Sequence, residues 1–178
     1  MTSDADETDA ATQVAGCSSL QPDGMPSAVT FSFDSARVDR DRVYGWLSRE
    51  AYWSIGIDRG VFERALDHSL LASSFADEVQ IAFARVVTDL ATFAWLCDVY
   101  VDTAHRGRGV GMRLVGAIVE HPDLQGLRRW ALRTRDAHPL YERFGFTALA
   151  DPPRFMERHN PHVYSGRPSG PASIGDPS

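Results

Sequence analysis

The chain has 178 residues, of which 43% are hydrophobic and 24% charged, and its net charge is −6. This composition is typical of one globular domain, and the negative charge argues against a general nucleic-acid binder. No apolar run reaches the roughly 20 residues of a membrane span, and the acidic start MTSDADETDA does not resemble a secretory signal. We therefore expect a cytoplasmic protein that binds neither nucleic acid nor membrane.

Composition separates a central domain from two polar ends. Residues 1–27 are rich in Ser, Thr, Asp and Ala, and residues 160–178 in Pro, Gly and Ser. Such segments bury too little apolar surface to offset the entropy of ordering them. The sequence predicts disordered tails at 1–27 and 160–178 and one domain at 28–159. Cys17 falls in the first tail and Cys97 in an apolar run, so we expect no structural disulfide.

Hydrophobic periodicity predicts an α/β domain with helices around a mixed sheet. Asp39 stands where it can cap the first helix, and a polar turn near Asp89 separates two β-branched and aromatic runs that are typical of an antiparallel hairpin. The predicted order is strand 28–34, helix 39–49, helix 58–71, hairpin strands 78–89 and 92–102, helix 109–120, strand 128–134, helix 137–144 and a last strand at 144–150.

The stretch RGRGVG, residues 106–111, lies between a predicted strand and a predicted helix. A helix N-terminus offers unpaired N–H groups and partial positive charge, and glycine lets the backbone approach an anion closely. Arg106 and Arg108 add cations suited to phosphate oxygens. The pattern favours a pyrophosphate-binding turn, although a tight turn with solvated arginines would show the same glycine spacing.

Two common phosphate motifs do not fit this stretch. A nucleoside triphosphate loop requires a lysine, and the chain contains none. A dinucleotide fingerprint requires a third glycine where this chain has Leu114, and it occurs early in a βαβ unit rather than late in the chain.

RGRGVG, preceded by VDTAH, resembles instead the acetyl-CoA-binding motif of the GCN5-related N-acetyltransferase (GNAT) superfamily. A second stretch, AHPLYERFGF at 137–146, resembles the other conserved block of that family. The chain departs from the family pattern at Thr103, where a proline is usual, and at Thr134, where many members carry asparagine. The resemblance is strong over residues 81–149 and consists only of element order over 28–80.

The resemblance implies a mixed, mostly antiparallel sheet flanked by helices, in which two neighbouring parallel strands splay apart to form the acetyl-CoA cleft. These would be the strands that end near Val101 and Thr134. The strand edge would pair with the pantetheine arm, and the backbone amides of the turn would hold the pyrophosphate. The implied cofactor-binding residues are Val99, Tyr100, Val101, Arg106, Gly107, Arg108, Gly109, Val110, Gly111 and Thr134.

Two residues are candidates for catalysis. Tyr141 matches the family tyrosine that points at the sulfur, and a phenol can protonate a departing thiolate. Asp98 is our candidate general base, because a carboxylate in an apolar strand needs a purpose or a partner, such as Arg85. Simple alternation places Asp98 on the face of Leu96 and Tyr100. Glu50 and Asp58 are alternative bases.

The stretch AYWSIGI supplies candidates for binding the acceptor. Tyr52 and Trp53 either form an aromatic wall for an amine or close the core beneath their loop. The histidines match no metal-ligand spacing, so we expect no metal. Cys97 has no histidine partner in the pattern and is interpreted as a small core residue.

The leading hypothesis is an N-acetyltransferase that moves an acetyl group from acetyl-CoA to a primary amine in a ternary complex. The acceptor, a small molecule or a protein amine, stays open, as does assembly into a homodimer. One alternative is a non-catalytic acyl-CoA sensor with the same fold, and another is an interaction protein that binds no nucleotide.

Overall fold

The computed structural model describes residues 29–164, so the predicted tail at 1–27 and most of the one at 160–178 lie outside the described residues. A five-stranded sheet forms its centre, with the strands side by side in chain order. Neighbouring strands are antiparallel except β4 and β5, which are parallel, so the mixed, mostly antiparallel sheet is confirmed. The strands are β1 (Val29–Ser32), β2 (Leu70–Ala76), β3 (Val79–Thr88), β4 (Phe93–Val101) and β5 (Arg129–Leu132).

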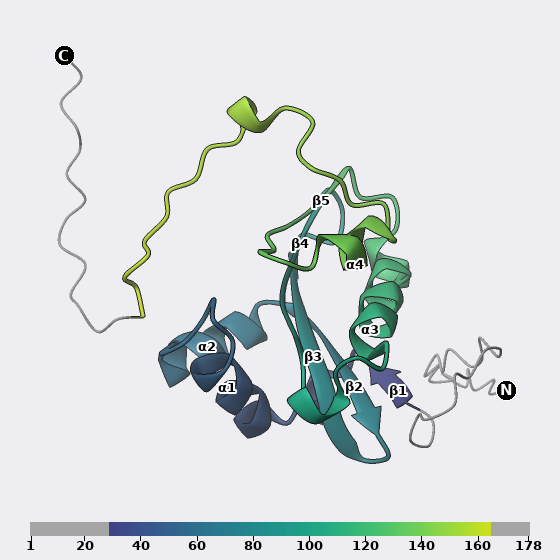
Figure 1. Cartoon of the computed structure of the whole chain (residues 1–178). Helices are drawn as coiled ribbons and strands as arrows, with labels where there is room; N and C mark the ends of the chain where they lie inside the picture. The colour runs from purple at the N-terminus through teal and green to yellow at the C-terminus, as the bar shows by residue number, and fades with distance from the viewer. Residues whose placement is uncertain (1–28, 165–178) are drawn as a thin grey trace, which may run out of the picture.

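Helices cover both faces of this sheet. Figure 1 shows α1 (Arg40–Arg49) and α2 (Arg59–Asp67) on one side and α3 (Val110–Val119) on the other, with the short α4 (His138–Glu142) above α3. Within residues 29–164 no helix has the length and hydropathy to cross a bilayer. Short 3₁₀ turns occupy Ser35–Arg37, Thr103–His105, Pro122–Leu124 and Pro152–Arg154.

Each helix layer buries its own apolar cluster against the sheet. On the first side, Val43, Trp46 and Leu47 of α1 pack with Phe62 of α2 and Tyr100 of β4. On the second side, the buried face of α3 packs against β2, β3 and β4. Burial of these side chains supplies the main favourable term in folding.

The caps of α1 and α2 explain where these helices begin. The carboxylate of Asp39 accepts a hydrogen bond from the Arg42 N–H at 3.0 Å, as predicted. Asp58 does the same for α2 by accepting from the N–H groups of Gly60 and Val61. These bonds satisfy amides that a helix N-terminus otherwise leaves unpaired.

Two predicted elements are wrong. The helix at 58–71 ends at Asp67, and β2 begins at Leu70. This strand went unrecognised because it is buried on both faces after its first residue, so no polar–apolar alternation marks it. The strand predicted at 144–150 does not form. The chain turns there at Gly145, and Phe146 packs its ring on Trp130 and Tyr141 instead of joining a ladder.

Candidate active site

An opening between β4 and β5 lies at the centre of the candidate site. The two strands pair from Phe93 and Arg129 only as far as Leu96 and Leu132. From Cys97 to Val101, β4 keeps β3 as its neighbour on one side and has no described strand on the other. The predicted divergence of two parallel strands is therefore present, and it exposes a strand edge with free backbone donors and acceptors.

A bulge in β4 shapes this edge. Phe83 pairs with Tyr100 and Arg85 with Cys97, so Ala84 alone faces both Asp98 and Val99. Asp98 accordingly has a left-handed φ of 54°.

The bulge overturns the predicted alternation of β4. Leu96 belongs to the cluster beneath α3, whereas Tyr100 belongs to the cluster beneath α1 and α2. The prediction that Asp98 shares one face with both was wrong, because an inserted residue shifts the side chains after it to the opposite face. The Asp98 carboxylate lies on the side of α1 and α2.

The glycine turn leads from β4 into α3. Gly107 and Gly109 both have φ of 74°, a left-handed conformation that side chains with a Cβ disfavour. Gly111 has a different reason to be glycine, since a Cβ there would stand 3.3 Å from Cγ2 of Val101. The first two glycines let the turn form, and the third lets α3 approach the end of β4.

The N-terminus of α3 is open to an anion. Gly109 caps the helix without a side chain, so the first-turn amides have no capping partner. Arg108 is exposed, and no hydrogen bond or ion pair holds its guanidinium within residues 29–164. Arg106 instead contacts β4. Its Nε donates to the Val101 carbonyl at 2.9 Å, and its guanidinium lies 5.1 Å from the ring centre of Tyr100. The turn therefore offers backbone amides and Arg108, while Arg106 fastens it to β4.

Thr134 and Tyr141 lie on the other side of the opening. The Thr134 hydroxyl accepts from the Ala137 N–H at 3.0 Å, so this oxygen organises the turn into α4. Tyr141 is 9% exposed, and burial raises the pKa of its hydroxyl to about 12, with a further contribution from Tyr52. The phenol therefore keeps its proton throughout the neutral range.

Tyr52 and Trp53 lie on the surface, which excludes the interpretation that they close the core. Their exposed fractions are 46% and 41%, and their rings meet edge to face with centres 5.0 Å apart. The Trp53 indole N–H donates to Oδ1 of Asp98 at 3.0 Å, and the Arg135 guanidinium lies 3.9 Å from the ring centre of Tyr52. The two rings thus join the α1–α2 loop to β4 and to the segment after β5.

The carboxylates of the site differ in what they bind. Asp98 forms an ion pair with Arg85 at 2.7 Å, and Arg85 also donates to the Ser69 hydroxyl. Burial is the largest single influence on Arg85 and acts to lower its pKa, but the charge of Asp98, its hydrogen bond and the other nearby groups together raise the pKa above its ordinary value. Glu50 accepts a hydrogen bond from the Tyr100 hydroxyl, and burial together with this bond raises the pKa of Tyr100 to about 12. Asp58 is occupied in capping α2.

Several other residues take no visible part in this chemistry. Burial raises the pKa of the Cys97 thiol to about 12, which makes it a poor nucleophile. No cluster of metal-ligating side chains occurs among the described residues. Arg135 and Ser69 contact the site but were not predicted from the sequence, because their partners lie far away along the chain.

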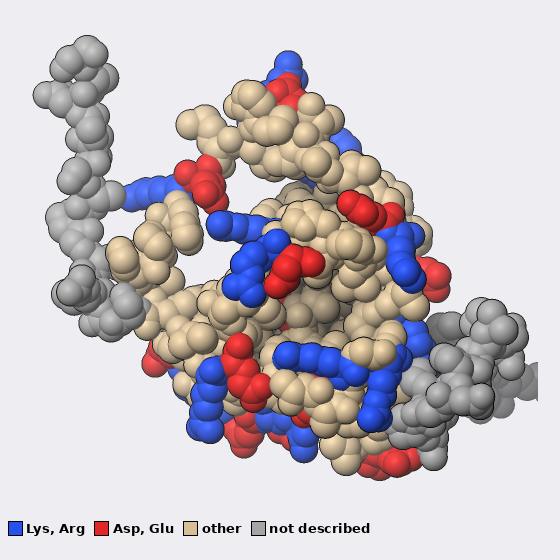
Figure 2. Space-filling view, in the orientation of Figure 1, with Lys and Arg blue, Asp and Glu red and all other residues tan. Residues whose placement is uncertain are grey.

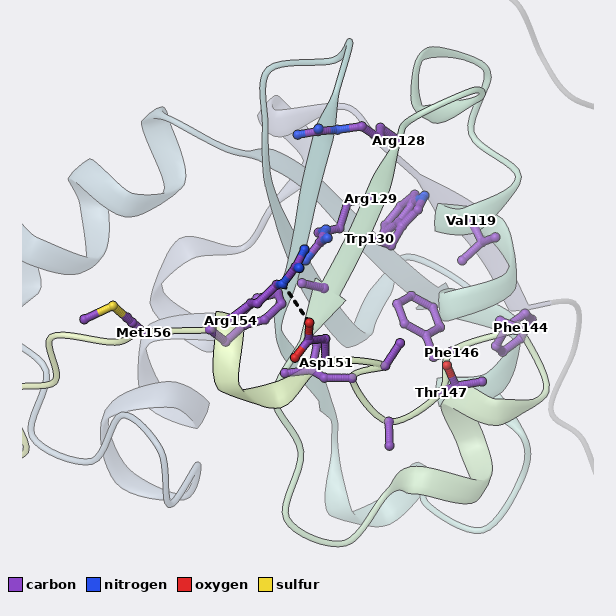
Figure 3. A pocket seen from close by; sticks show the side chains of 16 residues that line it. Val119, Arg128, Arg129, Trp130, Phe144, Phe146, Thr147, Asp151, Arg154 and Met156 are labelled. Carbon is purple, nitrogen blue, oxygen red and sulfur yellow. Dashed lines mark ion pairs between the residues drawn. The ribbon is translucent and has the colours of Figure 1, made fainter.

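A hollow of about 780 Å³ lies apart from this opening. Figure 3 shows its lining, which includes Arg128 just before β5, Arg129 and Trp130 from β5, Phe146 after α4, and Arg154 and Met156 from the C-terminal segment. It borders the start of β5, whereas the opening lies beyond the strand's C-terminal end. On the face drawn in Figure 2, basic and acidic side chains are interspersed, so this face presents no uniformly charged surface.

Comparison with known proteins agrees with this geometry. A family model described as an acetyltransferase (GNAT) domain matches residues 70–148. A crystal structure from Xanthomonas campestris pv. campestris, assigned to the GNAT family, is 48% identical, covers 80% of this chain and 99% of its own, and has a TM-score of 0.76. This chain belongs to the GNAT acetyltransferase family.

Two more distant structures share the fold alone. Glucosamine-6-phosphate N-acetyltransferase from Arabidopsis thaliana is 15% identical, with a TM-score of 0.53 over 75% of this chain and 99% of its own. The ribosomal-protein-S18-alanine N-acetyltransferase from Escherichia coli is 20% identical, with a TM-score of 0.56 over 67% of this chain and 78% of its own. The search of curated proteins gave no match.

Proposed function

We propose that this chain is an N-acetyltransferase that uses acetyl-CoA and acetylates a primary amine by direct transfer in a ternary complex. The observation that carries the proposal is the meeting of three features at one opening. These are the unpaired edge of β4 after Leu96, the uncapped N-terminus of α3, and the protonated hydroxyl of Tyr141.

The described residues fit acetyl-CoA, which would supply the acetyl group as a thioester. The backbone of Val99, Tyr100 and Val101 offers an edge along which a pantetheine amide can pair. The first-turn amides from Val110 onward and the free guanidinium of Arg108 suit a pyrophosphate. In our proposal the Thr134 hydroxyl keeps its hydrogen available to the cofactor, because only its oxygen is used in the turn.

Tyr141 acts as the general acid in this proposal. Its Oη–H gives its proton to the sulfur that leaves the acetyl group. A phenol whose pKa lies near 12 remains protonated at neutral pH, so its proton is available when negative charge develops on the departing sulfur. We therefore assign Tyr141 to the leaving-group side of the reaction.

We assign the proton-accepting role to Glu50 rather than to Asp98, which was our first candidate. Arg85 donates to one oxygen of Asp98 and Trp53 to the other, so both oxygens of this carboxylate are already engaged. Glu50 lies beside the same stretch of β4 through Tyr100, and no contact within residues 29–164 engages its Oε1. Asp98 instead positions Trp53 and the bulge.

The fold does not select the acceptor. One relative of this fold is named for an amino sugar phosphate and another for a ribosomal protein alanine. An amine free in water is only about one part in a thousand neutral at pH 7, so the site must favour the neutral form or remove a proton. Small-molecule and protein amines both meet this chemical requirement.

The test is release of CoA thiol across a panel of primary amines, together with calorimetric titration of acetyl-CoA. Turnover with at least one amine supports the proposal. Tight binding of acetyl-CoA without turnover for any amine would favour a non-catalytic sensor. Absence of acetyl-CoA binding would contradict both functions and leave an interaction protein.

A further inference from the structure

The C-terminal segment crosses back to the first helix layer. Figure 1 shows it leave the region of α4 and β5 and end, in yellow, near α1 and α2. Its last described residue, Tyr164, is partly buried and packs against the cluster formed by those helices. Composition alone assigns this residue to a polar tail, yet its side chain joins the folded body.

Gly56 in the α1–α2 loop holds the contact with Tyr164. A Cβ at Gly56 would stand 2.9 Å from the Tyr164 carbonyl oxygen, closer than atoms of this kind approach. Gly56 also has φ of 80°, which favours glycine. The loop and the segment therefore meet at a position where any larger residue would separate them.

Tyr164 also lies on the same side of β4 as the ion pair at the bulge. It packs against the cluster that contains Tyr100 of β4, and Asp98 of the ion pair faces the same helix layer. Trp53 donates to the same carboxylate from the α1–α2 loop. Arg85, Asp98, Trp53 and Tyr164 thus all lie on the α1–α2 side of β4, and we call this group the acceptor wall.

The acceptor wall lies on the side of β4 from which the acceptor amine would approach. The glycine turn, α3 and Tyr141 lie with the other buried cluster, where the proposed cofactor would be held. An acceptor must then reach the unpaired part of β4 from the side of the acceptor wall. An aromatic ring from the α1–α2 loop and one from the C-terminal segment stand on that side.

We propose that Tyr164 is a specificity-determining residue that limits the width of the amine, so that the site takes amines unbranched next to the nitrogen. This inference rests on the proposed function. Tyr164 acts by size, because its ring stands on the same side of β4 as Trp53, beside a carboxylate whose position the Arg85 ion pair restrains. Removing the ring should admit branched amines without changing how acetyl-CoA binds.

The experiment compares a branched and an unbranched primary amine of equal length by kcat/KM. We expect Tyr164→Ala to raise the branched-to-unbranched ratio about tenfold or more, the size of effect that small steric changes give in substrate pockets. Tyr164→Phe should keep the wild-type ratio. Gly56→Ala, which pushes the Tyr164 backbone away, should shift the ratio in the same direction as Tyr164→Ala. Val163→Ala, at the exposed neighbouring residue, is the matched control and should change nothing.

Two results would overturn the inference. One is an unchanged ratio in Tyr164→Ala, and the other is a uniform fall in acetyl-CoA affinity, which would make Tyr164 a purely structural residue. Calorimetric titration of the same amines into the protein saturated with CoA measures the ratio without turnover. Wild-type protein that turns over no amine, yet shows the expected binding ratios, would refute the proposed function and retain the width limit.

Discussion

Arg85 and Asp98 form an ion pair of 2.7 Å beneath Trp53, and their side chains are only 17% and 13% exposed. The pair joins β3 to β4 at the residue where β4 bulges. Its position explains why an ionisable residue can stand inside an otherwise apolar strand, since a buried charge requires a partner.

Replacing Asp98 with Asn should destabilise the fold by about 3 kcal/mol, because Arg85 keeps its charge without a partner. Asparagine retains an oxygen for the Trp53 N–H, so the loss reports mainly the missing charge. Urea unfolding of both proteins measures the difference. The double variant Arg85→Gln/Asp98→Asn should recover part of it, and a double variant no more stable than Asp98→Asn would show that the charges are not coupled.

The matched control for this prediction is the exposed pair of Arg133 and Glu157, separated by 3.8 Å with both side chains mostly in solvent. Glu157→Gln should leave the unfolding free energy within about 0.5 kcal/mol of wild type, because surface ion pairs contribute little.

Replacing Glu50 with Gln should remove the acidic limb of the pH–rate profile if Glu50 accepts the proton. The acidic limb of such a profile reports the group that must be deprotonated for the reaction to proceed. Asp98→Asn should keep that limb even where its rate falls. A profile that loses the limb only in Asp98→Asn would return the role of base to Asp98.

Replacing Gly109 with Ala should weaken acetyl-CoA binding in calorimetry, because a Cβ at a φ of 74° costs about 1 kcal/mol and disturbs the turn. Gly111→Val should weaken it more, since its side chain would meet Val101 and push α3 away from β4. Gly45 is the control: it lies within α1, and a Cβ added there would meet no atom within 4 Å, so Gly45→Ala should leave binding unchanged. Equal affinities in all variants would contradict the pyrophosphate turn.

Replacing Tyr141 with Phe should lower kcat by about 10²- to 10⁴-fold, the usual contribution of a general acid, with little change in acetyl-CoA affinity. Because burial raises the pKa of Tyr141 to about 12, wild type should show no loss of activity from this hydroxyl below about pH 11. Measuring kcat against pH for both proteins checks the two statements together. A fully active phenylalanine variant would exclude Tyr141 as the acid.

The same buried hydroxyl makes stability depend on alkaline pH. Its pKa is near 10 in the unfolded chain and about 12 in the folded protein, so only the unfolded chain ionises between these values. The unfolding free energy should therefore be unaffected by this group below pH 10 and fall by up to about 1.4 kcal/mol per pH unit above it. Denaturant titrations at several pH values should show a shallower fall in Tyr141→Phe, and parallel slopes would contradict the burial of the hydroxyl.

The sequence predicts those parts of the structure whose signals are carried by residues close together in the chain. The turn at Gly107 and Gly109 is predictable because a left-handed backbone selects glycine, and α1 is predictable because its cap and its buried face repeat at helical spacing. Both signals depend on residues close together in the chain, and so does the motif around Tyr141.

The sequence does not predict features that depend on contacts between residues far apart in the chain. The bulge at Asp98 is invisible to an alternation rule, because nothing in β4 itself indicates that Ala84 of β3 will face two residues. Likewise, Tyr164 stands among prolines, glycines and serines, and its contacts with Gly56 and the α1–α2 cluster are made by residues far away in the chain. The surroundings of a candidate catalytic group are thus harder to predict than its identity.

The outer edge of β5 has a consequence for handling the protein. No strand among residues 29–164 pairs with it, so its N–H and C=O groups form a template onto which another polypeptide can add. Arg128 and Arg129 are exposed at the start of this strand, and their like charges oppose the approach of a second copy. Polyanions that bind these guanidinium groups, or high salt that screens them, should therefore promote aggregation. The purified protein should accordingly be most stable in storage at modest ionic strength.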